Sequence, residues 1–132
     1  MQYNRLLLSV IVTLTLTLSA FVSTAIADST SRSGSFRGLS NHDTSGSVTV
    51  VQTEAGHVIE LGEDFSFDGA PDPKIALGKD GKYDPGTLIR LLKSNSGAQS
   101  YVVPESIDVS DYNEVYIWCE KYSVGLGVAS LK

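Results

Sequence analysis

The sequence predicts an all-β domain: an antiparallel β-sandwich or barrel-like structure with at most one or two short helical turns. Short runs rich in β-branched and aromatic residues recur after residue 46, and glycine, proline, asparagine or aspartate separates them. No alternation of strand and helix patterns is present, which argues against a nucleotide-binding α/β fold. Many short strands at this spacing are typical of sandwiches and barrels.

The first strands are indicated by local alternation of apolar and polar residues. We expect short strands at 47–51, 57–61, 65–67, 75–77 and 100–103. In Phe65-Ser66-Phe67, two aromatic side chains fall on one face of an extended segment. Residues 87–93 are ambiguous, since their leucines and isoleucine fit either a helical turn or a strand.

Residues 114–120 carry the strongest strand pattern in the chain. Alternation assigns to one face the side chains of Val115, Ile117 and Cys119. It assigns to the other face the side chains of Tyr116, Trp118 and Glu120.

Residues 124–131 form the last expected strand, and a turn at 121–123 predicts a hairpin with the strand before it. We expect three apolar residues on one face: Val124, Leu126 and Val128. Gly125 and Gly127 would lie opposite, where glycine indicates a close neighbour packed over the strand.

Length and charge limit the classes of function. The chain has 132 residues and a formal net charge of −5, with 10 Lys and Arg against 15 Asp and Glu. An acidic protein of this kind is a poor ligand for nucleic acid, because phosphate binding needs a basic face. The same charge argues against adhesion to anionic lipid.

Residues 1–27 have the pattern of a secretory signal peptide. Arg5 precedes an apolar stretch, and Ala25-Ile26-Ala27 is the small-x-small pattern that a signal peptidase cleaves. An uncleaved membrane anchor is the alternative, since the apolar stretch is just long enough to span a bilayer. We expect cleavage, and therefore an exported, periplasmic or secreted protein with no stable membrane anchor. Residues 28–35 are then a flexible linker, and residues 36–132 form the domain.

Cys119 is the only cysteine, so no intramolecular disulfide can form. Three interpretations remain open. The thiol can be a small buried hydrophobe, as its register with Val115 and Ile117 suggests. It can be a redox thiol, or it can be a ligand of haem or a metal with His42 or His57 as a partner.

Other chemistry-bearing residues give weaker indications. Trp118 is either a packing anchor or a ligand-stacking residue. The two histidines lack the spacing of a dedicated zinc site. Asp64, Asp68 and Asp72 could hold calcium, although turn and capping roles suit their sequence context better. No hydrolase motif is present.

Three segments together resemble a known family. They are Asp64 to Leu77, Asn95 to Pro104, and Val115 to Tyr122 with Val124 and Ala129-Ser130-Leu131 behind it. An Asp-Phe, a Pro-Asp, a Gly-x-Gln-x-Tyr-x-x-Pro and an Ile-Trp-Cys occur in that order after an opening phenylalanine. This pattern, from about Phe36 to Leu131, is similar to the DM-thirteen family, which is labelled an electron-transfer domain.

The resemblance implies a β-sandwich-like domain that takes part in a redox step through Cys119. The cysteine would act as a bare thiol or would hold a prosthetic group; the cofactor is unknown, and haem is one possibility. Trp118 beside it would shape access, and an unknown redox protein would be the partner. The protein would thus be a redox or binding module rather than a classical enzyme.

The alternative function is a non-catalytic extracytoplasmic binding or adhesion module, in which Cys119 is only core packing. Acidic loops or exposed aromatic residues would then meet the partner. The candidate aromatic residues are Tyr83, Tyr101, Tyr112, Tyr116 and Tyr122.

Overall fold

The computed structural model describes residues 30–132 as an all-β domain. Its strands are β1 (Ser31–Gly38), β2 (Thr44–Ser45), β3 (Ser47–Thr53), β4 (Gly56–Leu61), β5 (Ser66–Phe67), β6 (Pro73–Lys79), β7 (Lys82–Tyr83), β8 (Arg90–Leu91), β9 (Gln99–Val102), β10 (Glu114–Cys119) and β11 (Val124–Ser130). Two 3-10 turns complete it, η1 (Pro85–Thr87) and η2 (Val109–Asp111). The predicted fold class is confirmed. The predicted signal peptide, residues 1–27, lies outside the described residues.

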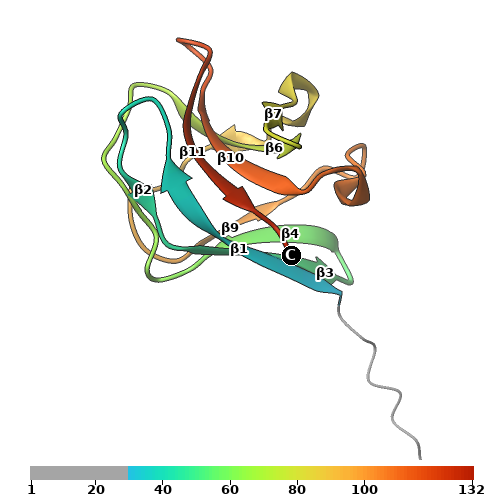
Figure 1. Ribbon diagram of the computed structural model, residues 1–132. Coiled ribbons are helices and arrows are strands. Elements are labelled where there is room, and N and C mark those ends of the chain that lie inside the picture. The colour runs from blue at the N-terminus through green and yellow to red at the C-terminus, as the bar shows by residue number, and fades with distance from the viewer. Residues whose placement is uncertain (1–29) are drawn as a thin grey trace, which may run out of the picture.

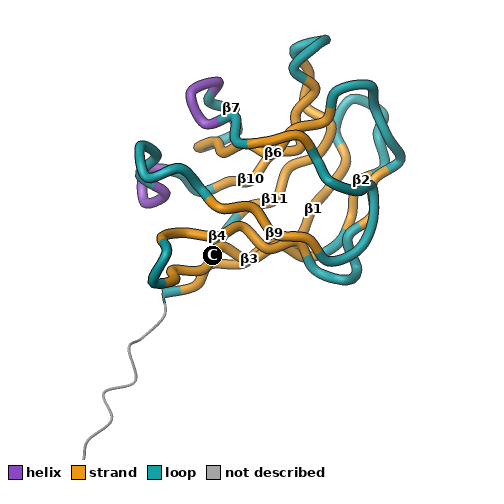
Figure 2. Tube along the Cα trace, turned by 180° about the vertical axis from the view of Figure 1, so that it is seen from behind, coloured by secondary structure: helices purple, strands orange, loops and turns teal. Residues whose placement is uncertain are grey.

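Nine of the strands form one antiparallel sheet, which curls into a half-barrel (Figures 1 and 2). The strand order is β7-β6-β10-β11-β1-β3-β4-β9, and β8 pairs with β6 beside this path. Strands β2 and β5 form a separate two-stranded sheet. Within residues 30–132, no helix has the length and apolar character needed to cross a membrane.

The curl of the sheet encloses one main core. Strands from both ends of the sheet contribute fully buried side chains to it, among them Val48, Ile59, Ile75, Leu77, Val115 and Ile117. Phe65 and Phe67 share one face, as predicted, and both are buried in this core, whereas Ser66 between them is exposed. The ring of Phe65 meets Phe36 of β1 edge to face, with centroids 5.5 Å apart.

Strand β1 begins before the predicted start of the domain. Residues 31–35, which we assigned to the flexible linker, pair with residues 47–51 of β3. Lys132 and Ser33 also exchange two backbone hydrogen bonds, so the C-terminus pairs with this segment. The order here comes from main-chain pairing with neighbours distant in sequence, and the polar side chains gave no signal of it.

The predicted hairpin of residues 114–130 is present, but a β-bulge shifts its second strand. Ile117 pairs with Gly127 whereas Trp118 pairs with Gly125, which leaves Leu126 without a partner in β10. The prediction that Val124, Leu126 and Val128 share one face is therefore wrong. Leu126 belongs to the main core, whereas Val128 lies on the opposite face of the sheet.

The close neighbours predicted at the glycines of β11 are present. A Cβ on Gly127 would lie 2.6 Å from Cγ2 of Thr44, and one on Gly125 would lie 2.9 Å from Cδ1 of Leu39. The ambiguous residues 87–93 form no helix beyond the end of η1, because Arg90 and Leu91 pair with β6 as β8.

Candidate functional site

Strand β10 carries both predicted site residues and directs them to opposite faces of the sheet. Cys119 lies in the main core with Val115 and Ile117, as the alternation predicted. Trp118 packs instead with Tyr116 on the outer face. Because the strand is regular here, adjacent residues cannot share a face, and the sheet itself separates the thiol from the indole.

Cys119 is the last residue of β10 and is buried, with 1% of its surface exposed. Its ladder neighbours are Val124 on β11 and Pro73 on β6. The turn that follows, residues 120–123, is exposed. The thiol therefore sits inside the core, one residue from an exposed turn.

The residues around Cys119 do not fit a haem or a metal ion bound through its sulfur. Cys119 lies in the wall of none of five surface cavities formed by residues 30–132. His42 hydrogen-bonds Asp68, with Nδ1 and Oδ1 2.8 Å apart, and His57 lines other cavities. Residues 30–132 contain no group of three His, Cys, Asp or Glu side chains placed to hold a metal.

The three aspartates considered for calcium have separate partners. Asp64 accepts hydrogen bonds from the backbone and hydroxyl of Ser47, which lower its pKa. Asp68 accepts from the backbone of Asp43 and pairs with His42, and these two contacts, in that order, lower its pKa. Asp72 accepts from the backbone N–H of residue 121. Each carboxylate thus fastens a turn, in keeping with the capping roles favoured by the sequence.

The outer face of β10 carries an aromatic cluster, which we define as Tyr83, Tyr116 and Trp118. The rings of Tyr83 and Trp118 stack, with centroids 3.8 Å apart and planes 13° apart. Tyr116 meets both rings edge to face, at 6.3 and 6.4 Å. Offset stacking and edge-to-face contacts are the favourable geometries for such rings.

Tyr116 is held in its neutral form. Its hydroxyl donates to Oε2 of Glu114 at 3.1 Å. Desolvation is the first cause that raises the pKa of Tyr116 to about 12, and the charge of Glu114 adds to it, whereas Arg37 opposes the shift. The carboxylate of Glu114 also accepts from the backbone N–H of Gly81.

A groove of about 520 Å³ runs over the aromatic cluster, and we call it the outer groove. Gly125 and Val128 of β11 line it together with the cluster. Its other lining residues are Arg37, Leu39 and Ser40 from one segment and Gly81 and Lys82 from another. Sequence reasoning singled out Trp118 but missed the walls, because they come from segments brought together only by strand pairing. The alternating Tyr116 and Trp118 were the one local signal.

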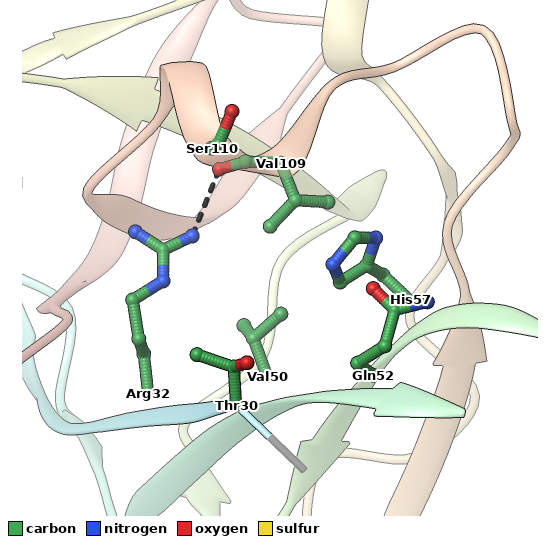
Figure 3. A pocket seen from close by; sticks show the side chains of 7 residues that line it. All are labelled: Thr30, Arg32, Val50, Gln52, His57, Val109 and Ser110. Carbon is green, nitrogen blue, oxygen red and sulfur yellow. Dashed lines mark hydrogen bonds between the residues drawn. The ribbon is translucent and has the colours of Figure 1, made fainter. Parts of the chain in front are cut away.

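A second cavity, of about 370 Å³, lies between β1, β3, β4 and η2 (Figure 3). His57 faces it from one side and Arg32 from the other. The Arg32 guanidinium donates to the carbonyl oxygens of Tyr112 at 2.6 Å and Val109 at 2.8 Å, which ties η2 to β1. The hydrogen bonds of Arg32 therefore hold η2 against β1.

The tyrosines proposed as an exposed binding surface differ in their exposure. Tyr101 is buried, with 2% exposed, and so is Tyr116. Tyr83 and Tyr112 are half-buried, and Tyr122 alone among the five is exposed, at 61%. The expectation of five exposed aromatic residues is therefore wrong for Tyr101 and Tyr116, since burial of their rings completes the two packed faces of the sheet.

Comparison with known proteins identifies the family. A family model described as electron transfer DM13, the family called DM-thirteen above, matches residues 35–131. Neither the curated proteins nor the solved structures gave a match. Since the matched segment runs from β1 to the end of β11 and includes both Cys119 and the aromatic cluster, the chain belongs to the DM13 electron-transfer family.

Proposed function

We propose that the protein is an exported electron-transfer module that works through the bare thiol of Cys119. The observation that carries this proposal is the position of the only sulfur nucleophile of a DM13 domain, at the end of β10 and beside an exposed turn. An unpaired thiol is unusual in an oxidising compartment, and the signal-peptide pattern of residues 1–27 supports export to such a compartment.

Burial determines how such a thiol would react. With 1% exposure, Cys119 reacts only when the end of the hairpin opens. The opening required is short, because the pair Cys119 and Val124 is the last pair of the β10–β11 ladder. On its other side, Cys119 faces Pro73, which has no N–H to donate to the ladder.

The reaction we propose is thiol–disulfide exchange with a partner protein. The Cys119 thiolate attacks one sulfur of a partner disulfide and forms a mixed disulfide, and the second partner sulfur leaves as a thiolate. Cys119 is thereby oxidised and the leaving sulfur is reduced. Attack of a second thiolate on the partner's sulfur of the mixed disulfide then breaks that bond and releases the Cys119 thiolate. The second thiol is oxidised to a disulfide with the partner, and Cys119 returns to its reduced form.

Labelling kinetics test this proposal. The native protein is exposed to a small maleimide over a series of low urea concentrations, with Cys119→Ser bearing a new Ser123→Cys thiol in the exposed turn as the unprotected reference. We expect a rate well below the reference that stays constant in low urea, which is the behaviour of local opening. A labelling rate that follows global unfolding at every urea concentration would contradict the proposal that Cys119 reacts through local opening of the hairpin end.

The second candidate is a non-catalytic binding module, and the burial of Cys119 in the core favours it. Cys119→Ala distinguishes the two functions in a native host. If this variant folds normally and loses a redox phenotype, the binding module is excluded. If it loses stability and no redox phenotype changes, Cys119 is core packing alone.

Export is tested separately by the intact mass of the protein purified from its native host. We expect a mature chain that begins at Asp28, after the Ala25-Ile26-Ala27 cleavage pattern. A chain that keeps Met1 in the membrane fraction would show an uncleaved anchor instead.

A further inference from the structure

We propose that the outer groove is a binding site for a planar aromatic anion, meaning a conjugated ring system that carries a carboxylate or phosphate group. The inference goes beyond the proposed function, because this groove lies on the face of the sheet opposite Cys119 and does not use its thiol. It depends on three features of the groove: its aromatic surface, its charge and its size.

The aromatic surface is the first feature. Trp118 and Tyr83 are only half-buried although their rings stack on each other, so both line the groove and keep ring surface open to it. Gly125 lies directly beside the indole: a Cβ at this position would be 3.6 Å from Cζ3 of Trp118 and 2.9 Å from Leu39. Because Gly125 has no side chain, the end of the Leu39 side chain packs close to the indole, and both residues line the groove. A flat conjugated ring is the ligand that gains most from such a surface.

Charge is the second feature. Arg37 of β1 and Lys82 of β7 line the groove, and no acidic side chain does. Neither cation forms an ion pair with any of residues 30–132. In a chain of net charge −5, two unpaired cations gathered over one aromatic surface favour an anionic ligand.

Size is the third feature. The groove holds about 520 Å³, which lies within the range of about 300 to 1,000 Å³ typical of small-molecule sites. Two acidic residues act on the tyrosines of the aromatic cluster, and both have other partners. Glu114 accepts from the hydroxyl of Tyr116 and the backbone N–H of Gly81, and Asp84 accepts from the hydroxyl of Tyr112 and the backbone N–H of Gly86. A compact ring with one anionic group matches these dimensions better than a protein segment would.

The experiment compares two flavins that share one ring system. Flavin mononucleotide carries a phosphate and riboflavin does not, and stacking on tryptophan or tyrosine quenches the fluorescence of both. Titration at low salt should give an affinity for the mononucleotide about tenfold or more above that for riboflavin, because charge-assisted hydrogen bonds form only with the phosphate. Addition of salt should reduce this preference.

Matched charge variants locate the effect. Arg37→Gln with Lys82→Gln should remove the preference for the phosphate, whereas Arg90→Gln with Lys93→Gln, which line a different cavity, should keep it. Both pairs remove the same charge from the protein. Trp118→Leu should lower the affinity for both flavins, and Cys119→Ser should change neither affinity. Circular dichroism checks that each variant is folded.

Three results would overturn the proposal. One is equal affinity for the two flavins, which would show that the two cations do not select an anionic ligand. The second is that Arg90→Gln with Lys93→Gln removes the preference for the mononucleotide as fully as Arg37→Gln with Lys82→Gln does, which would show a general effect of net charge. The third is a dissociation constant above about 1 mM both for the mononucleotide and for a second planar anion, anthracene-2-carboxylate.

Discussion

The two faces of strand β10 differ in what covers them. On the inner face, Val115, Ile117 and Cys119 are closed off by the curled sheet and are at most 1% exposed. On the outer face, Tyr116 is buried, but Trp118 keeps part of its surface open to the outer groove. Residues adjacent in sequence therefore have opposite access to a ligand.

This difference assigns different kinds of chemistry to the two faces. A thiol in a closed core acts only through local opening, so its reactivity depends on the stability of the hairpin end. An aromatic groove acts in the folded state, with no opening. The family resemblance drew attention to the inner residue, whereas the geometry makes the outer residue the accessible one.

The largest expected effect is a loss of stability on the inner face of β10, which is packed more tightly than the outer face. Ile117→Ala should lower the free energy of unfolding by about 2–5 kcal/mol, because it leaves a cavity in a fully buried site. Trp118→Ala should cost about 1–2 kcal/mol, since a half-exposed ring gives up less buried area. Urea denaturation measures both. Equal losses would show that the outer face is packed as tightly as the inner one.

Alanine substitutions at the two glycines of β11 compare the same two faces by adding a methyl group instead of removing side-chain atoms. Gly127→Ala should cost about 1–3 kcal/mol, because the new Cβ meets the branched side chain of Thr44, which is fixed by its hydrogen bond to Leu126. Gly125→Ala should cost less, since its closest contact is the end of the flexible Leu39 side chain. Thermal denaturation of the two variants measures these losses of stability. A greater loss at Gly125 would contradict the difference between the faces.

The outer face should also respond to alkaline pH. The pKa of Tyr116 is about 12 in the folded protein, against about 10 in an unfolded chain. The folded state therefore retains this proton between these values, so its contribution to stability is complete below pH 10 and is lost as the pH rises toward 12.

Absorbance of tyrosinate tests this expectation. Tyr116→Phe should remove a late phase of the titration and reduce the loss of stability above pH 10. The pKa values of Tyr83 and Tyr101 are also raised, chiefly by desolvation, so part of the alkaline loss should persist in the variant. An unchanged titration would show that Tyr116 ionises with the other tyrosines.

The smallest effect is expected at the solvated end of the hairpin. Glu120→Gln removes the ion pair with Lys74, which also has Asp72 within reach at 3.7 Å. Because the pair is exposed, the loss should be below about 1 kcal/mol and should vanish in high salt. Chemical denaturation in low and high salt measures it. A loss comparable to that of Ile117→Ala would mean that this end of the hairpin is not the weak point proposed for thiol access.

Much of the fold was predictable because strand alternation is a local property. The two faces of β10, the pair Phe65 and Phe67, and the hairpin of β10 and β11 all followed from a period of two. The same reasoning assigned the wrong face to part of β11, because the bulge at Leu126 interrupts the two-residue alternation of faces. The flanking glycines were the only sequence signal of this bulge. Reasoning from alternation also failed for residues 31–35, where main-chain pairing alone creates the strand.

The candidate site was predictable only in part for the same reason. Cys119 and Trp118 are distinctive as the only residues of their types, so both were identified. Arg37 and Lys82 are ordinary surface cations in the sequence. They meet at one groove only because β1 and β7 lie on opposite sides of β10 and β11 in the sheet. Such a juxtaposition depends on strand order, which a single sequence does not specify.

The bulge at Leu126 has a consequence for how this strand tolerates changes in length. The residues on either side of Leu126, Gly125 and Gly127, already pair with consecutive positions of β10. Removal of Leu126 would therefore regularise the ladder and leave every other side chain of β11 on its present face, at the loss of one core leucine. Single-residue deletions elsewhere in the strand would invert the faces of all residues beyond them, so natural length variation in this hairpin should concentrate at this one position.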